Sequence, residues 1–180
     1  MQRCAWAGSS PEYVAYHDEE WGTPLHGDDA LFERMCLEAF QSGLAWITIL
    51  RKRPAFRTAF AGFSIDAVAE FGPEDEERLM ADAGIVRNRA KIAAAVRNAR
   101  TAQQQPEGLS ALLWSFAPTG PRPRPATMAD VPATSPESVA MARELKRRGF
   151  VFVGPTTAYA LMQATGMVDD HVADCFRASP

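Results

Sequence analysis

The chain has few cysteines, no long apolar run and no excess of positive charge. Its 180 residues include only three cysteines, Cys4, Cys36 and Cys175, which are too few for a disulfide framework or for an all-cysteine iron–sulfur cluster. No apolar stretch approaches membrane-spanning length, and the N-terminal residues MQRCAWAG lack the apolar core of a signal peptide. We therefore expect a cytoplasmic protein with no membrane segment.

The net charge of −3 produces no overall field that would attract nucleic acid, although a local basic patch can still bind it. With 47% hydrophobic and 23% charged residues, the composition is that of an ordinary globular chain. The length suits one domain over residues 1–180, or two lobes that share one core.

Every segment with a clear hydrophobic period has the helical period, so the sequence predicts an all-α protein. Five prolines between Ala117 and Ala133 forbid regular structure in that loop. Caps, prolines and glycines place the predicted helices at residues 11–20, 29–42, 46–53, 54–60, 64–71, 73–83, 89–104, 109–116 and 135–148.

The stretch from Gly149 to Cys175 is the most informative. Its four apolar residues 150–153 could form a buried strand, but Gly154 and Pro155 suit the start of a helix better. We predict a helix, a hairpin near residues 149–157, a second helix ending at Gly166, and a last short helix that contains residues 169–175. A glycine at a hairpin tip lets a phosphate approach the main chain, but a plain helical turn remains the alternative.

Three further patterns each allow two interpretations. His171 and Cys175 are four residues apart and could share a metal ion, or be core residues. Tyr13, Tyr16, His17 and Glu20 share one helix face, with Trp6 and Trp21 flanking it; such a stripe is usually core, but its polar tips suit a pocket that stacks a flat ring.

Glu38 occupies a position on a helix face where Leu31 and Met35 predict an apolar residue. It is either a carboxylate in an apolar pocket, with a raised pKa or a cationic partner, or the partner of Arg34 on an exposed edge. The sequence alone does not separate these two possibilities.

Several motifs together resemble the 3-methyladenine DNA glycosylase I family, a zinc-bearing branch of the helix-hairpin-helix DNA glycosylases. The resemblance covers residues 3–175 and is carried by Cys4-x-Trp6, Tyr13-x-x-Tyr16-His17-Asp18-x-Glu20-Trp21-Gly22, Gln41-x-Gly43-Leu44-x-Trp46, Asp82-Ala83-Gly84-Ile85 and Asp170-His171-Val172. It implies the helix-hairpin-helix glycosylase fold with both termini joined at a structural zinc ion, held by Cys4, His17, His171 and Cys175. Two sulfur and two nitrogen ligands complete a tetrahedral site and leave no position for water.

The resemblance also assigns roles around a flipped base. Glu38, Tyr16 and Trp46 would contact the damaged base, Trp6, Tyr13 and Trp21 would line its pocket, and Gly43 and Leu44 would lie near the gap that it leaves. The hairpin at Val153 and Gly154 would hold the DNA backbone. Apart from the resemblance, the charge runs 87–91 and 51–53 predict a basic patch for DNA binding that includes Arg89 and Lys91.

The implied activity is hydrolytic removal of 3-methyladenine from alkylated double-stranded DNA, by a monomer that releases the free base. A methylated adenine carries positive charge, which aromatic faces and a carboxylate recognise. Related bifunctional enzymes have a lysine just after the hairpin glycine, where this chain has Pro155 and two threonines, so we expect no strand cleavage.

One residue departs from the family pattern. Asp169 stands where this branch often has asparagine; it could stabilise an oxocarbenium ion, or cap the helix predicted around His171, and we favour the cap.

Two other functions are alternatives to the glycosylase: a non-catalytic DNA-binding module that senses lesions, and a zinc hydrolase. The hydrolase requires an open coordination position, which the four-ligand set argues against.

Overall fold

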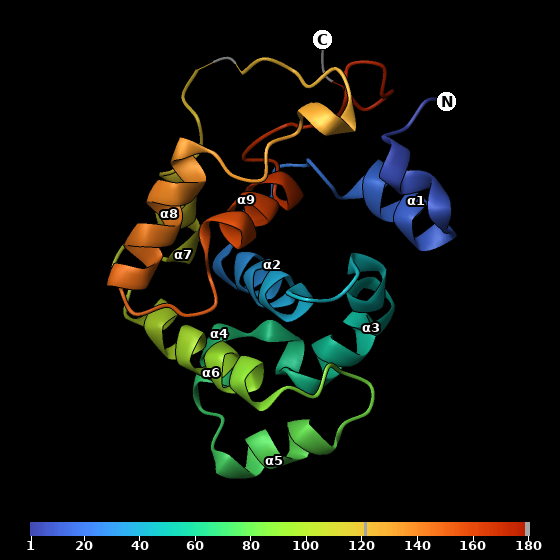
Figure 1. The fold of residues 1–180 in the computed structure, drawn as a ribbon. Coiled ribbons are helices and arrows are strands. Elements are labelled where there is room, and N and C mark those ends of the chain that lie inside the picture. The colour runs from blue at the N-terminus through green and yellow to red at the C-terminus, as the bar shows by residue number, and fades with distance from the viewer. Residues whose placement is uncertain (121, 179–180) are drawn as a thin grey trace.

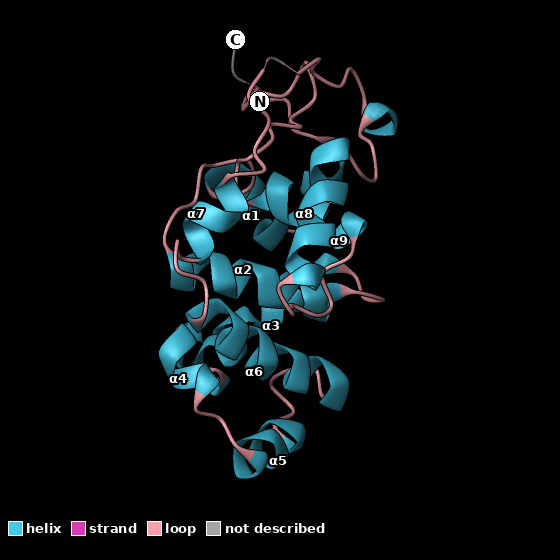
Figure 2. Ribbon diagram, turned by 90° about the vertical axis from the view of Figure 1, so that its left-hand side faces the viewer, coloured by secondary structure: helices cyan, strands magenta, loops and turns pink. Residues whose placement is uncertain are grey.

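A computed structural model describes residues 1–120 and 122–178 as a set of helices joined by short connections, with no strand among those residues (Figures 1 and 2). The α-helices are α1 (Pro11–Glu19), α2 (Asp28–Gln41), α3 (Trp46–Ala59), α4 (Ile65–Ala69), α5 (Pro73–Ala81), α6 (Arg89–Gln103), α7 (Leu109–Trp114), α8 (Pro136–Arg147) and α9 (Pro155–Ala164). Short 3₁₀ helices cover Ala5–Ser9, Ala61–Phe63 and Met128–Asp130. The prediction of an all-α fold is confirmed for the described residues.

Helix α2 lies near the middle of the molecule, and most of its side chains are buried. The main core packs residues of α2 against α3, α4, α6, α7 and α9, whereas a smaller apolar cluster gathers around Cys4, Trp21 and Val172. Figure 2 shows α5 at one end of the molecule and the two termini at the other. The space beside α2 and α9 is therefore bordered by segments from both halves of the chain.

Local signals account for most helix starts. The side chains of Ser10, Ser64, Asn88 and Ser135 each accept a hydrogen bond from a backbone N–H of the following helix, and proline occupies the first turn of α1, α5, α8 and α9. These caps satisfy N–H groups that have no partner within the helix.

Helix α3 corrects one predicted boundary. A single helix runs from Trp46 to Ala59 with Pro54 inside it, where the sequence predicts two helices that meet at Pro54. The buried residues Ile49 and Phe56 lie on either side of the proline. Core packing on both sides outweighs the hydrogen bond that the proline removes.

A second prediction is wrong: the segment 169–175 contains turns rather than the predicted short helix. Its backbone finds partners outside a helix: His171 N–H donates to the Asp169 carboxylate (3.1 Å), and Ala173 N–H donates to the Pro125 carbonyl (3.0 Å). Contacts made by distant parts of the chain thus replace the helical hydrogen bonds.

The C-terminal segment returns to the N-terminal one. Phe176 N–H donates to the Gln2 carbonyl at 2.9 Å, and Gly22 N–H donates to the Gln163 carbonyl at 3.1 Å. Gly166 makes this approach possible, since a Cβ there would lie 2.5 Å from the Pro24 nitrogen. None of the helices in the described part of the chain is both long and apolar enough to span a membrane.

Candidate functional site

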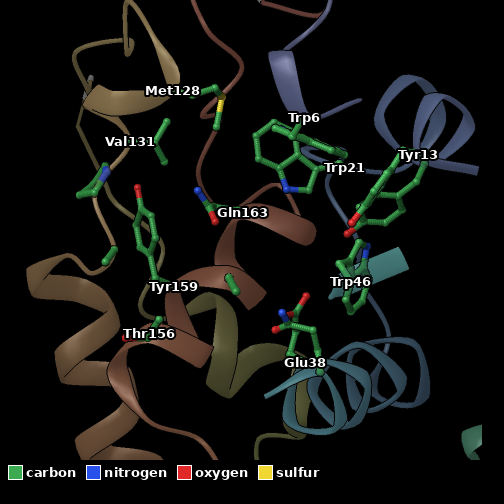
Figure 3. Close-up of a pocket in the computed structure, with 15 residues that line it drawn as sticks. Trp6, Tyr13, Trp21, Glu38, Trp46, Met128, Val131, Thr156, Tyr159 and Gln163 are labelled. Atoms are coloured by element: carbon green, nitrogen blue, oxygen red, sulfur yellow. The ribbon is translucent and has the colours of Figure 1, made fainter. Parts of the chain in front are cut away.

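A pocket of about 400 Å³ opens between α2 and α9, within the size range of small-ligand sites (Figure 3). Aromatic side chains dominate its lining, and helices α1, α2 and α9 supply most of its polar groups. The lining residues are Trp6, Tyr13, Tyr16, Trp21, Glu38, Gln41, Trp46, Met128, Val131, Pro132, Ala133, Thr156, Tyr159, Ala160 and Gln163.

The aromatic wall is a connected set of rings. Trp6 packs edge-on against Tyr13 and Trp21, with ring centroids 5.6 and 5.2 Å apart, and Tyr16 lies 5.5 Å from Trp46. The Ile47 N–H donates to the Tyr13 hydroxyl at 3.0 Å, which ties the wall to the first turn of α3. Trp46 Nε1 is buried and has no hydrogen-bond partner among the described residues, so it remains available to a ligand.

Glu38 is 6% exposed, and its carboxyl group points into the pocket (Figure 3). Burial raises the pKa of Glu38 to about 8, and the positive charge of Arg34 offsets only part of that effect. No other described residue forms a hydrogen bond with this carboxyl group. The pocket therefore contains a buried acid that lacks a partner of its own.

Arg34 does not form the exposed pair with Glu38 that was one of the two predicted possibilities. Both arginines near this site, Arg34 and Arg53, instead bind Glu20, and Arg53 does so through two bonds of 2.7 Å. Burial tends to raise the pKa of Glu20, but its bonds to Arg53 and Arg34 lower it to about 2. This cluster lies against the buried ring of Tyr16, since the Arg34 guanidinium is 5.7 Å from it.

Helix α9 supplies polar groups that the sequence analysis did not single out. The Tyr159 hydroxyl donates to the buried Asp170 carboxylate at 2.6 Å, and Gln163 Nε2 donates to the same carboxylate at 2.8 Å. Thr156, Tyr159 and Gln163 recur at helical spacing, and this polar stripe on an apolar helix could have identified them. Met128 and Val131 lie in the proline-rich loop, where no sequence pattern indicates a pocket wall.

The four predicted metal ligands, Cys4, His17, His171 and Cys175, come together in one buried cluster that can hold a metal ion. Their ligand atoms lie within 4.8 Å of one another. The Cys175 sulfur is 3.4 Å from His17 Nε2 and 3.7 Å from His171 Nδ1, and the Cys4 sulfur is 3.8 Å from His171 Nδ1. Bonds of 2.0–2.3 Å to a tetrahedral ion give ligand separations of about 3.3–3.8 Å, so the cluster fits such an ion.

Hydrogen bonds behind the cluster fix the orientation of both histidine rings. His17 Nδ1 lies 2.8 Å from the Asp18 carboxylate, which Arg3 also binds, and His171 Nε2 lies 3.1 Å from the Trp21 carbonyl. Both oxygens can only accept, so the other ring nitrogen of each histidine is left with a lone pair that faces the sulfurs. Metal-binding histidines require such hydrogen bonds to fix their ring orientation, and both histidines of the cluster have one.

Two loops near the pocket contain the predicted DNA-contacting residues. Gly43 and Leu44 form the turn after α2, in which Gly43 adopts a φ of 83° and Leu44 is exposed. Val153 is buried, and Gly154 is the exposed N-cap of α9. None of these four residues lines the pocket itself.

The basic residues of the predicted patch have very different surroundings. Arg89 is exposed and binds Glu77 (2.7 Å), whereas Lys91 is buried, and its ammonium donates to the carbonyls of Phe40 and Ser42. Arg53 is bound to Glu20, and Lys52 donates to the carbonyls of Ala83 and Gly84. The charge run by itself does not indicate which of these cations face solvent.

The contacts of Asp169 with His171 and Arg124 lie outside the pocket. One carboxylate oxygen accepts the His171 N–H at 3.1 Å, and the other accepts from Arg124 at 3.0 Å. It does not line the pocket. These contacts favour the structural alternative, in which Asp169 holds the turn before His171.

A family model described as methyladenine glycosylase matches residues 6–178. DNA-3-methyladenine glycosylase 1 of Escherichia coli (strain K12) is 45% identical over 179 residues, which cover 97% of this chain and 96% of the relative.

Solved structures of 3-methyladenine DNA glycosylase I are also similar to this chain. A crystal structure of 3-methyladenine DNA glycosylase I has a TM-score of 0.94 and 43% identity and covers 99% of this chain and 100% of the other. A variant of 3-methyladenine DNA glycosylase I in complex with 3-methyladenine has a TM-score of 0.90 and 34% identity and covers 97% of this chain and 96% of the other.

Proposed function

The chain belongs to the methyladenine glycosylase family, and we propose that it is a DNA-3-methyladenine glycosylase of base excision repair. Its reaction is hydrolysis of the bond that joins 3-methyladenine to deoxyribose in alkylated DNA. A base inside a duplex must first be flipped out, at a cost of a few kcal/mol. The pocket beside Glu38 is the place where the flipped base would bind.

The observation that carries this proposal is the partnerless acid of Glu38 among aromatic rings. A methylated adenine is cationic, so its glycosidic bond is already weakened and the leaving group needs little protonation. Recognition of positive charge is therefore the main task of the pocket. Glu38 would supply a charge-assisted hydrogen bond once a cation lies beside it. Each aromatic face adds cation–π attraction of about 0.5–2 kcal/mol.

We assign base contact to Glu38, Tyr16 and Trp46, and the surrounding wall to Trp6, Tyr13 and Trp21. The ring separations of 5.2–5.6 Å in this wall are typical of packed aromatic side chains, which would hold a flat base in a fixed orientation. Water would be the nucleophile. None of the 15 lining residues is a lysine, which supports base removal without a Schiff base and hence without strand cleavage.

We propose zinc as the ion of the Cys4, His17, His171 and Cys175 cluster. Two thiolates and two imidazoles are a common structural zinc set, and the three sulfur–nitrogen distances of 3.4–3.8 Å match those around a tetrahedral ion. The ion would join the N-terminal segment to the C-terminal one, and it would leave no coordination position for substrate. Its contribution would then be to hold Trp6, Tyr16 and Trp21 in the pocket wall, since these residues are close in sequence to Cys4 and His17.

Duplex DNA would be held by the hairpin at Val153 and Gly154 and by the turn at Gly43 and Leu44, with Arg89 as a phosphate contact. The first turn of α9 follows Gly154, and free N–H groups at a helix start favour a phosphate. We also propose that the protein acts as a monomer. Sedimentation of the protein with and without DNA would test that state.

The deciding experiment measures free 3-methyladenine released from methylated duplex DNA in single turnover. Release by the wild-type protein with no nicking of the strand is expected. Glu38→Gln should slow release and weaken binding of the free base by about 1.5–3 kcal/mol, while duplex affinity and metal content stay unchanged. If the protein binds methylated DNA but releases no base, it is a non-catalytic lesion-binding module instead.

A further inference from the structure

One polar side chain of the pocket, Gln163, has no part in the proposed function. It lies in the last turn of α9, and Figure 3 shows it reaching into the cavity from a different side than Glu38 of α2. Its backbone is anchored, because the Gln163 carbonyl accepts the N–H of Gly22 at 3.1 Å. The amide group of Gln163 therefore enters the pocket from a fixed point of the main chain.

The orientation of this amide is set by Asp170. Gln163 Nε2 donates to the Asp170 carboxylate at 2.8 Å, and Asp170 is 4% exposed. The same carboxylate oxygen accepts the Tyr159 hydroxyl at 2.6 Å. An oxygen that already receives a hydroxyl proton can only accept, so it must face the nitrogen of the amide and not the oxygen. Turning the amide over would place two lone-pair oxygens against each other in a buried position.

Tyr159 cannot relax this arrangement. Its hydroxyl has a single proton, which it donates to Asp170, and it accepts a hydrogen bond from Arg122 at 2.9 Å. Burial and the bond to Asp170 raise the pKa of Tyr159 to about 12, so the hydroxyl keeps its proton at neutral pH. Neither the hydroxyl nor the carboxylate can thus donate to the Gln163 oxygen.

The fixed orientation leaves the amide oxygen, Oε1, as an acceptor without a partner. No described residue donates to Gln163 Oε1. The other glutamine of the pocket, Gln41, differs, because its nitrogen donates to the Leu44 carbonyl in an exposed turn, where water can replace that bond. Gln163 therefore presents only an acceptor to a ligand, whereas an amide that can turn over presents either end.

We propose that Gln163 is a specificity-determining residue that accepts a hydrogen bond from the 6-amino group of the base, and that Asp170 is the positioning residue that prevents its amide from turning over. The identity of the ligand as an N3-methylated purine rests on the proposed function. The amino group has two N–H donors, so Glu38 and Gln163, on different helices, can each accept one. A purine with a carbonyl oxygen at this position would face the Gln163 oxygen with no proton between them. The pair thus selects 6-amino purines over 6-oxo purines.

The first test compares two free bases that differ at the 6-position. 3-Methylhypoxanthine has a carbonyl oxygen where 3-methyladenine has the amino group, and calorimetric titration gives the Kd of each. Gln163→Met keeps the length of the side chain but removes the acceptor. The preference for 3-methyladenine, expressed as the ratio of the two Kd values, should fall about tenfold, because one hydrogen bond is lost and one repulsion is relieved. A ratio equal to that of wild type overturns the proposal.

Gln103→Met is the matched control. Gln103 lies on α6 outside the pocket, and its Nε2 also donates to an aspartate, Asp66, at 2.8 Å. This variant removes the same kind of glutamine–aspartate bond, so its ratio of Kd values should equal that of wild type. An equal fall in both variants would indicate an indirect effect and overturn the assignment to Gln163.

Asp170 is tested through the orientation that it imposes. In Asp170→Ala the Gln163 amide can turn its nitrogen towards a carbonyl and its oxygen towards an amine, so the ratio should fall about tenfold. In Asp170→Asn the ratio should recover, because the asparagine carbonyl can still accept the Gln163 N–H. Both bases are titrated into the same preparation, so any loss of folded protein affects them equally. A wild-type ratio in Asp170→Ala, or no recovery in Asp170→Asn, overturns the positioning role.

The proposed function can fail separately from this inference. A wild-type protein that binds neither base would refute the base pocket and this inference together. Binding of 3-methyladenine with a ratio that Gln163→Met leaves unchanged would refute this inference alone. A protein that releases no base from DNA would refute the glycosylase, whereas the titrations involve no chemistry and judge Gln163 and Asp170 by themselves.

Discussion

Arg34 and Glu38 lie one turn apart on α2, yet Arg34 binds Glu20 and leaves Glu38 without a hydrogen bond from any described residue. The pKa values of Glu20 and Glu38 consequently differ widely. Burial of Glu20 is outweighed by its bonds to Arg53 and Arg34, which bring its pKa to about 2, whereas burial raises the pKa of Glu38 to about 8. Near neutral pH the free protein thus has an ionised carboxylate at Glu20 and a largely protonated acid at Glu38 inside the pocket.

The first prediction concerns the pH dependence of base excision. Glu38 must ionise to attract a cationic base, so kcat/KM should rise as pH increases from 6 towards 8, by up to about tenfold per pH unit, and level off above the pKa. Glu38→Gln should lack this rise. Single-turnover excision from methylated duplex DNA, measured from pH 6 to 9, is the test. Parallel profiles for the two proteins would mean that Glu38 does not control recognition.

The second prediction concerns stability. The pKa of Glu38 is about 8 in the folded protein and near 4.5 when unfolded, so the folded state holds the proton more tightly. The free energy of unfolding associated with this group is therefore fully present below pH 4.5 and is lost as pH rises towards 8. The difference between the two pKa values corresponds to about 4 kcal/mol at pH 8. Glu38→Gln removes that loss, so its melting temperature should exceed that of wild type by about 8–16 °C at pH 8 but not at pH 4.5. Calorimetry at the two pH values tests this, and an equal difference at both would contradict it.

The third prediction concerns the metal. Purified protein should contain one zinc ion per chain, and Cys175→Ser or His171→Ala should lose it together with much of the thermal stability, because the ion joins both ends of the chain. Cys36→Ala is the matched control: Cys36 is also buried but lies outside the ligand cluster, so metal content should stay at one. Elemental analysis and thermal melts with a chelator provide the measurements. Full zinc content in Cys175→Ser would refute the four-ligand assignment.

The fourth prediction concerns Arg89 as a phosphate contact. Arg89→Glu should reduce the slope of log affinity against log salt by about one, since the exposed Arg89 can exchange its Glu77 partner for a phosphate. Arg147→Glu is the control, because Arg147 is exposed and paired in a similar way on α8 and belongs to no predicted contact. A slope that falls equally in both variants would indicate a general charge effect rather than a phosphate contact at Arg89.

The all-α class and most helix starts could be predicted because capping residues and prolines act within a few residues of their own position. His171 and Cys175 do meet in the ligand cluster, as their spacing suggests, although the short helix predicted around them is absent. The continuation of α3 through Pro54 could not be predicted in this way, because it depends on core packing on both sides of the proline.

The sequence by itself determined which side chains were available: a ligand set at the two ends of the chain, an aromatic stripe on α1, and an acid on the apolar face of α2. Only the tertiary structure decided their surroundings. Glu38 is partnerless because Glu20, from a distant segment, binds Arg34, and Lys91 supports a turn rather than facing solvent because the carbonyls of α2 end beside it. The pocket wall at Met128 and Val131 likewise exists only because the proline-rich loop returns over α9. Burial and long-range pairing depend on packing between distant segments, and local sequence patterns carry no information about that packing.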